Sequence, residues 1–554
     1  MIKRGDPARP ETGPINIGPR AIRPMHADHH WLNSIWYEAP REDPAWPEVY
    51  VYTDAISYEA GETVIFRGST TADAWSLIID RDGLHPTIVH RAAHLPGRFT
   101  PMPKDAYKAG CNWPEVHAWR IPEGTPSGFY RVASSCERRD GSRFVQHHFF
   151  VVRPTGGTRR ERLLMLLPTA TWSAYNDWGG ANHYFGIDGS TEDRFSPVLT
   201  LQRPWTRGAV WLPEGAPRVA LGASPPPLAA PRYPQKEWAY STGFGYYYCA
   251  WGWAQFDRHF ARWAEGEGYA FDMITQTDLH FRPEIISDYA CIVIVGHDEY
   301  WTREMRETID RYVEQGGRLA RFGANFMWQI RLEEAGARQI CYKHLAATED
   351  PIRNSDPGRL TTLWEDPAVN WPGATTVGVN GFGGVYASWG GFGPRGARGF
   401  TVYRPEHWIF DKTDLHYGDI FGAQAAIFGY EVDGLDYTFR HGLPFPTGAD
   451  GAPEAVQILF MTPAMNAEVE HYGEGFRYYL RDSDLRLFAG LVEGSTDPDT
   501  LTKRFPGSGM LVQMSSGKGE VITAGTCEWV MGLKLNDFYT QQITRNVLDR
   551  FIAS

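Results

Sequence analysis

Three acceptor-rich side chains, His297, Asp298 and Glu299, follow directly on an apolar run from Cys291 to Val295 that ends at Gly296. A short continuous run of apolar residues is typical of a fully buried strand. In an open parallel sheet, ligands bind in the crevice beyond the carboxyl ends of the strands. The sequence therefore predicts a functional site at residues 297–299.

The stretch 289–329 contains the elements that must position this site. After residue 301, apolar side chains recur at the helical spacing of Met305, Ile309, Tyr312 and Val313, and Gly316 and Gly317 form a helix stop. A second predicted strand then ends at Asn325. We expect a strand, a turn, a helix and a second strand, with the polar residues at the tip of the first strand.

Tyrosines upstream could supply further ligand atoms. The apolar run at 163–167 predicts a buried parallel strand, which we expect to end in the segment that carries Tyr175. If this strand neighbours the one before Glu299, the two side chains meet, and Tyr184 in the following loop could reach them. Phenolate and carboxylate oxygens favour a hard ion such as ferric iron over zinc. The alternative is that these tyrosines are core residues with paired hydroxyls.

A catalytic nucleophile is a weaker prediction. An acyl-transfer hydrolase on an α/β sheet needs small residues around the nucleophile, as in G-x-S-x-G. The near match surrounds Cys527, but Glu528 and Trp529 follow it. The six cysteines are scattered without a CxxC pair, which indicates buried thiols and neither a zinc site nor a disulfide framework.

Composition limits the class of protein. A chain of 554 residues is too long for a single hydrophobic core. Its net charge of −12, with acidic and basic residues interspersed, argues against a nucleic-acid partner. No apolar run is long enough for a membrane span, and the first residues lack a signal-peptide core, so we expect a cytoplasmic protein. Aromatic residues make up 14% of the chain, which suits large cores but also sugar binding. A carbohydrate-binding or scaffolding protein is therefore an alternative.

The chain divides into three predicted parts. Residues 1–45 lack periodicity and are expected to form an extended arm. Short alternating strands over 46–155 predict an immunoglobulin-like β-sandwich. Residues 158–554 predict a doubly wound α/β catalytic domain, flavodoxin-like or glutamine-amidotransferase-like, and a Gly- and Trp-rich insertion at about 351–450 is expected to cover the site. The predicted fold class is thus α/β plus β.

Several motifs together resemble those of one enzyme family. GHDEYWT and GGRLARFGANFMWQ, with SAYN upstream and GYEVDG and CEWVMGL downstream, resemble the large (beta) subunit of N,N-dimethylformamidase, especially its C-terminal domain. The resemblance implies a mononuclear iron, Fe(III), held by two tyrosinates and one glutamate. In this sequence these match Tyr175, Tyr184 and Glu299, with Tyr240 as the alternative second tyrosine.

The resemblance also implies a reaction. It predicts an iron-dependent amidohydrolase that cleaves the C–N bond of a small-molecule amide, with His297, Asn325 and Glu431 as catalytic residues. Either Glu431 or His297 would take a proton from water, and Asn325 would donate to the developing oxyanion. The family's phenylalanine near this asparagine is Gly323 here, so a metal hydrolase with another substrate is a further alternative. A homo-oligomer is expected, and the family implies a separate small subunit.

Overall fold

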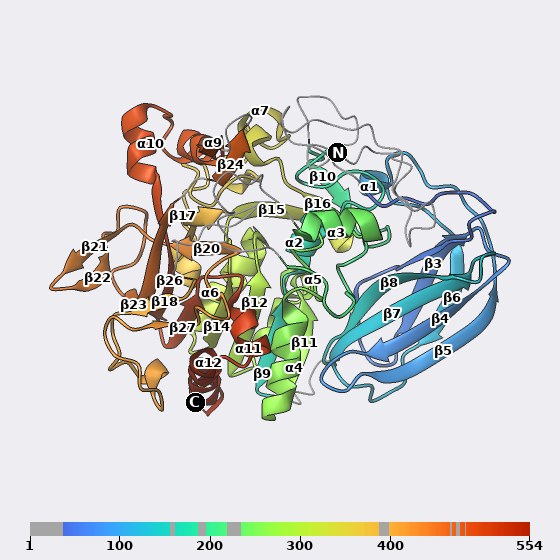
Figure 1. Ribbon diagram of the computed structural model, residues 1–554, viewed down its shortest axis with the longest axis horizontal. Helices are drawn as coiled ribbons and strands as arrows, with labels where there is room; N and C mark the ends of the chain where they lie inside the picture. The colour runs from blue at the N-terminus through green and yellow to red at the C-terminus, as the bar shows by residue number, and fades with distance from the viewer. Residues whose placement is uncertain are drawn as a thin grey trace.

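The computed structural model describes residues 37–155, 161–186, 195–218, 234–386, 398–465, 468–472, 477–481 and 483–553. It is a mixed α/β plus β protein, in which an N-terminal β-sandwich flanks a larger α/β part (Figure 1). Most of the predicted N-terminal arm, up to residue 36, lies outside the described residues.

Two sheets form the sandwich. One contains β1 (Val49–Thr53), β3 (Thr63–Thr70) and β6 (Glu115–Arg120), and the other has the order β2 (Ser57–Tyr58), β8 (Arg143–Val152), β7 (Gly128–Glu137), β4 (Ala74–Arg81) and β5 (Thr87–Pro96). Alternate residues point into one shared core, for example Phe66 from the first sheet and Leu77 from the second. The alternation that predicted strands here is therefore confirmed. The short helix α1 (Ala106–Ala109) precedes β6.

A nine-stranded sheet forms the centre of the α/β part. Five parallel strands come first, in the order β11 (Phe271–Thr275), β9 (Leu163–Leu167), β12 (Cys291–His297), β14 (Arg318–Ala324) and β27 (Gly519–Ala524). Four antiparallel strands continue it, namely β26 (Pro506–Ser516), β23 (Gln457–Met465), β18 (Phe400–Val402) and β19 (Ile420–Phe421). Counted along the chain, the parallel strands lie in the order 2-1-3-4-5, so the order reverses between β9 and β12. Such a reversal is where open α/β sheets bind ligands.

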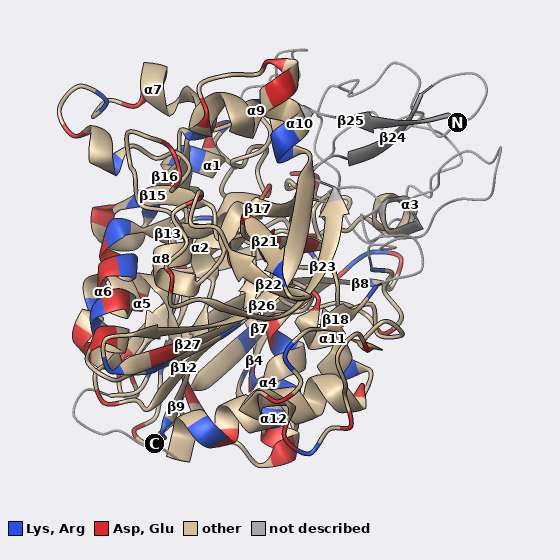
Figure 2. Cartoon of the chain, turned by 90° about the vertical axis from the view of Figure 1, so that its left-hand side faces the viewer, with Lys and Arg blue, Asp and Glu red and all other residues tan. Residues whose placement is uncertain are grey.

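Helices cover both faces of this sheet, because its buried strands are apolar on both sides. Leu163 and Leu167 of β9 pack in one core with α4 (Asp257–Glu267), α11 (Trp529–Lys534) and α12 (Phe538–Ala553). Leu164 and Leu166 pack in the other core with α5 (Gln276–Phe281), α6 (Arg303–Glu314) and α8 (Ala374–Val377). The outer face of α6 carries alternating acidic and basic residues (Figure 2).

One sequence-based expectation needs correction at the end of β9. The strand ends at Leu167, and residues 169–175 form the buried helix α2 (Thr169–Tyr175). Tyr175 therefore lies at the carboxyl end of a helix and not at the end of a strand. A four-stranded sheet of β10 (Val198–Thr200), β16 (Arg338–Ile340), β15 (Trp328–Glu333) and β13 (Tyr300–Thr302) lies beyond the central strands (Figure 1).

The region 351–450 is partly continuous with the central sheet, since β18 and β19 extend the edge of that sheet. Within it, β17 (Asn380–Tyr386) pairs with β20 (Glu431–Gly434), and β21 (Tyr437–Arg440) pairs with β22 (Leu443–Pro446). Residues 387–397 of the predicted insertion lie outside the described residues. The other elements are α3 (Pro234–Thr242), α7 (Ala346–Glu349), α9 (Ser483–Val492), α10 (Pro498–Arg504), β24 (Glu468–Tyr472) and β25 (Arg477–Arg481), with short 3-10 turns between them.

Two expectations concern the chain as a whole, namely its cysteines and its lack of a membrane span. All six cysteines are free and buried, as their scattered positions predict. Among the described residues, no helix has both the length and the apolar character needed to cross a membrane.

Candidate active site

Glu299 occupies the loop directly beyond β12 and is buried. Its backbone N–H donates to the Thr171 hydroxyl of α2 over 2.8 Å, which ties the two sides of the strand-order reversal together. Its carboxylate accepts hydrogen bonds from the Tyr184 hydroxyl at 2.6 Å and from the Trp328 indole at 2.8 Å. The structure thus holds this carboxylate in one orientation at the ligand-binding edge of the sheet.

Two tyrosine rings lie beside this carboxylate. The ring centroids of Tyr175 and Tyr184 are 4.3 Å apart. Asn182 fixes both residues, since its amide donates to the Tyr175 carbonyl and its oxygen accepts from the Tyr184 backbone N–H. Burial, followed by the charge of Glu299, raises the pKa of both phenols well above the ordinary tyrosine value. Two phenol groups and one carboxylate, all of which can supply anionic oxygens, therefore lie together in a buried part of the protein.

His297 is the last residue of β12 and faces two carboxylates. Its Nδ1 donates to the Ala250 carbonyl at 2.6 Å, which leaves Nε2 at 2.8 Å from Glu431 Oε2 and 3.4 Å from Glu299 Oε2. Burial alone would lower the pKa of His297, but the two carboxylates outweigh it and raise this pKa to about 10. Burial raises the pKa of Glu431. This geometry places one proton between an imidazole and a carboxylate.

Asn325 follows β14 and contacts both His297 and Glu431. Its side-chain amide donates to Glu431 Oε2 at 2.7 Å and lies 3.0 Å from His297 Nε2. Its backbone is left-handed, with φ of 69°, a conformation that asparagine adopts more readily than most residues. The Asp433 carboxylate holds this conformation by accepting the Asn325 backbone N–H at 2.6 Å.

A buried triad of charged side chains connects the ends of β12 and β14 with β20. Arg321 of β14 pairs with Asp298 at 3.0 Å and with Asp433 at 2.9 Å, and all three side chains are fully buried. Asp298 also accepts the Trp301 indole N–H at 2.7 Å. Asp298 therefore faces away from its two neighbours in the sequence and towards Arg321.

Sequence reasoning missed two polar neighbours of Tyr184. The Tyr300 hydroxyl donates to the Tyr184 hydroxyl at 2.9 Å, and the Lys343 ammonium lies 3.6 Å from the Tyr184 ring centroid. Tyr300 is adjacent to the polar cluster and could have been proposed from that position. No local pattern marks Lys343, which comes from a 3-10 turn beyond β16.

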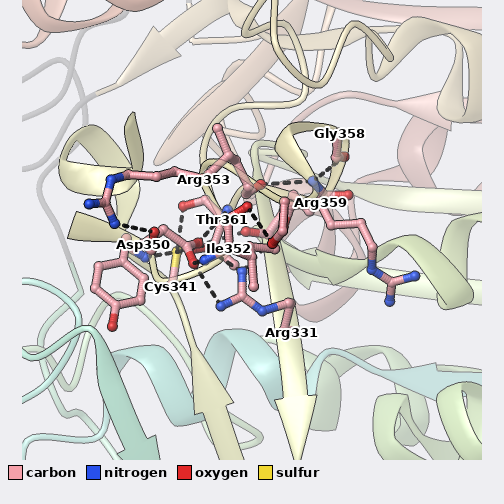
Figure 3. Close-up of polar contacts among 12 residues, drawn as sticks. Arg331, Cys341, Asp350, Ile352, Arg353, Gly358, Arg359 and Thr361 are labelled. Carbon is pink, nitrogen blue, oxygen red and sulfur yellow. Dashed lines mark hydrogen bonds and ion pairs between the residues drawn. The ribbon is translucent and has the colours of Figure 1, made fainter. Parts of the chain in front are cut away.

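A polar network fixes the turn that carries Lys343. The Lys343 backbone N–H donates to the Thr361 carbonyl at 2.8 Å. Thr361 and Arg331 both converge on the Asp350 carboxylate, and Arg331 reaches its two oxygens at 2.8 and 2.9 Å (Figure 3). Because Arg331 belongs to β15, the network joins this turn to the strand that begins at Trp328.

Tyr240 is less well placed than Tyr184 as a second tyrosine. It packs in a separate hydrophobic cluster with Phe244, Tyr246 and Tyr248. Tyr184, in contrast, packs against the core that contains Tyr175 and bonds Glu299 directly. The geometry thus favours Tyr184 over the alternative that the sequence left open.

Two sets of side chains in this centre could hold a metal ion. Tyr175, Tyr184 and Glu299 offer hard oxygen donors, and the side chain of Tyr175, a buried residue, makes no hydrogen bond within the described residues. His297, Glu431 and Cys527 also place ligand atoms within 4.8 Å of one another. In that second set the imidazole and the carboxylate already bond each other, and burial raises the Cys527 pKa well above its ordinary value. The oxygen set therefore fits a hard cation better.

Comparisons with known proteins agree with the motifs. The family described as "N,N-dimethylformamidase beta subunit-like, C-terminal" matches residues 81–543. An N,N-dimethylformamidase beta subunit from Alcaligenes sp. is 22% identical over 472 residues, which cover 80% of this chain and 54% of that protein. The chain thus spans about half the length of this curated relative.

Two solved structures each resemble a small part of the chain. The sporulation control protein Spo0M of Bacillus subtilis matches 20% of this chain and 50% of its own, at 14% identity and a TM-score of 0.16. The PmoD soluble domain of Methylocystis sp. matches 24% of this chain and 99% of its own, at 13% identity and a TM-score of 0.13.

Proposed function

The chain belongs to the N,N-dimethylformamidase beta subunit-like family, and we propose that it is a metal-dependent hydrolase of the C–N bond of a small amide. One observation supports this most strongly. Two tyrosines and Glu299 converge with the His297–Glu431 pair where the strand order reverses. Such an arrangement places acidic oxygen ligands next to a group that can carry protons.

We propose that the metal is a single ferric ion held by Tyr175, Tyr184 and Glu299. When bound, such an ion polarises a carbonyl and lowers the pKa of water. The donor set supports this choice, because phenolate and carboxylate oxygens suit a hard, highly charged cation. A cation bound by these oxygens would lower the pKa of both phenols, because a nearby positive charge favours the phenolate.

The residues around the ligands would move the proton. The Ala250 carbonyl, which accepts the Nδ1–H of His297, orients the ring so that Nε2 faces Glu431. This pair can accept a proton from the attacking water and return it to the departing amine. The Asn325 amide, whose backbone N–H bonds Asp433, would donate to the oxyanion that forms on the carbonyl oxygen.

The finer predictions about fold and assembly also remain proposals. The strand order 2-1-3-4-5 supports a flavodoxin-like α/β domain, and the two-sheet sandwich supports an immunoglobulin-like domain. The matched relative is named as a beta subunit, which supports a partner subunit for this chain. We also propose a cytoplasmic homo-oligomer.

Metal analysis and amine release together test the proposed function. Purified protein should contain about one iron per chain, absorb visible light through tyrosinate-to-iron charge transfer, and release amine from formamides or larger amides. Tyr175→Phe, Tyr184→Phe and Glu299→Ala should each lose iron and activity. Tyr50→Phe is the matched control, because it also removes the hydroxyl of a buried tyrosine, but in the sandwich core.

The opposite outcomes are equally clear. Full iron retention in all three ligand variants would refute the ligand assignment. A colourless wild-type protein that binds glycans and releases no amine would favour the carbohydrate-binding alternative.

A further inference from the structure

A cavity of about 790 Å³ lies apart from the proposed metal ligands. It is bordered by α4, by α11 and by the segment before residue 219, and the two helices pack against each other (Figures 1 and 2). Phe256 lies between this cavity and the candidate active site. Its ring centroid is 5.1 Å from the Arg218 guanidinium carbon and 6.5 Å from the His297 ring.

Cationic side chains dominate the lining of this cavity. Arg218, Arg258, Arg262 and Lys534 line it, and Glu214 is the one carboxylate among the lining residues. This local excess of positive charge contrasts with the net charge of −12 for the whole chain. A concentration of one sign of charge in a hollow raises the local concentration of ligands of the opposite sign.

Two of the four cations are held in place by carboxylates outside the lining. Arg218 bonds Glu528 at 2.8 and 2.9 Å, and Arg258 bonds Asp82 at 2.6 and 3.1 Å. These ion pairs fix the positions of the two guanidinium groups at the wall. Glu528, the partner of Arg218, directly follows Cys527 in the sequence. The Cys527 backbone N–H in turn donates to the Glu431 carbonyl at 3.0 Å.

The other two cations lack such partners. Neither Arg262 nor Lys534 makes a side-chain hydrogen bond or ion pair within the described residues.

Crowding among these cations is unfavourable. Burial and the charges of Arg218 and Arg258 lower the pKa of Lys534, although Glu528 opposes this. Burial and the same group of cations lower the pKa of His259 well below its ordinary value, so this lining residue is a neutral imidazole. A bound anion would relieve the repulsion and accept hydrogen bonds from several donors at once.

The rest of the lining is apolar. Trp211, Leu212, Trp263 and Leu533 contribute aromatic and aliphatic surface to the same cavity. Trp211 is also 37% exposed, which is unusual for so large an apolar side chain. Apolar walls with a few convergent polar groups, in a volume of this order, characterise small-molecule sites.

We propose that this cavity binds a small organic oxyanion, a carboxylate or phosphate ester that carries an apolar or aromatic group. Arg262 and Lys534 would bind the anionic group. The guanidinium groups of Arg218 and Arg258, held by their carboxylate partners, would lie beside it. Trp211 and Leu533 would contact the apolar part. The site is distinct from the amide-hydrolysing centre and does not depend on the identity of its metal.

Calorimetric titration with phenyl phosphate tests the proposal directly. The wild-type chain should bind it saturably, and affinity should fall as salt increases. The double variant Arg262→Gln/Lys534→Gln should bind at least tenfold more weakly, because each lost charge-assisted hydrogen bond weakens binding about tenfold or more. Arg91→Gln/Lys503→Gln is the matched control, since it removes the same two charges from exposed positions elsewhere and should bind like the wild type.

A second comparison separates the two halves of the site. Trp211→Ala should weaken phenyl phosphate but leave inorganic phosphate unchanged. Absence of saturable binding to the wild type, or equal affinity in the Arg262/Lys534 variant, would overturn the proposal. Binding is measured without turnover, so failure of the proposed amidase activity would leave this result unaffected.

Discussion

Replacing Asp433 with asparagine removes one of the two carboxylates that neutralise the buried guanidinium of Arg321. It also disturbs Asn325, because a carboxamide can accept from only one of these two neighbours. Its NH₂ group would face either the Arg321 guanidinium or the Asn325 backbone N–H, which the carboxylate now binds at 2.9 and 2.6 Å. Repulsion from the charged group is stronger, so we expect the amide to turn its NH₂ towards Asn325.

The magnitudes follow from these contacts. Removing one partner from a buried ion pair costs about 3 to 5 kcal/mol, and the lower end applies because Arg321 keeps Asp298. Displacing a single oxyanion donor lowers kcat about a hundredfold or more. Asp433→Asn should therefore lose about 3 kcal/mol of unfolding free energy and at least a hundredfold in amine release.

Asp298→Asn is the matched control for this prediction. It removes the other carboxylate of Arg321, and its amide likewise has one oxygen for two donors, the Arg321 guanidinium and the Trp301 indole, but it has no bond to Asn325. Denaturant unfolding should show similar destabilisation in the two variants, whereas only Asp433→Asn should lose most of kcat. Equal losses of kcat, or normal kcat in Asp433→Asn, would refute the argument that Asp433 positions Asn325.

Two further predictions concern stability. Burial lowers the pKa of His148 to about 3 in the folded chain, where its Nε2 accepts the Thr53 backbone N–H. As pH falls from about 6.5, His148 therefore takes up a proton in the unfolded chain before it does so in the folded chain. Unfolding free energy should therefore decrease by about 2 kcal/mol between pH 6.5 and 5 on account of this residue, and His148→Gln should lack that part of the pH dependence in denaturant titrations. Gly323→Ala should cost about 1 to 3 kcal/mol in thermal unfolding, because a Cβ there would lie 2.7 Å from the Gly296 carbonyl oxygen, and an unchanged melting temperature would contradict this reason.

The Gly323 contact also explains why the family's phenylalanine is incompatible with this backbone. Strand β14 approaches β12 too closely at this position for any side chain to point towards Gly296. The sequence shows only that the residue type differs. The close approach is a property of two strands separated by a helix, so no local pattern reveals it.

Regular elements with a buried apolar face could be predicted from the sequence. The run at 291–295 forms β12, and the helical spacing of Met305, Ile309, Tyr312 and Val313 forms α6, with all four side chains buried. Within the predicted sandwich, β5 carries no such signal, because most of its side chains are exposed and its sequence lacks clear alternation. The helix that carries Tyr175 was missed because it is buried on all sides, and thus has no amphipathic pattern.

Proximity within the site was only partly predictable. The prediction that Tyr175 and Glu299 meet depended on β9 and β12 being neighbours, which the sheet order confirms. Glu431 and Lys343 approach from other segments, one through the β17–β20 pair and one through a turn. Contacts of this kind depend on tertiary packing, and local periodicity carries no information about them.

The position of Cys527 bears on the weaker nucleophile hypothesis. Its thiol is fully buried, and burial together with the Glu431 charge raises its pKa well above the ordinary value, so the reactive thiolate is disfavoured. Its backbone N–H instead donates to the Glu431 carbonyl, and the adjacent Thr526 forms a bridge to Val432. The segment that most resembled a nucleophile elbow therefore fixes the strand that carries the proposed proton acceptor. Because a positioning role needs only the backbone, Cys527→Ala should retain amine release, whereas a nucleophile could not be replaced in this way.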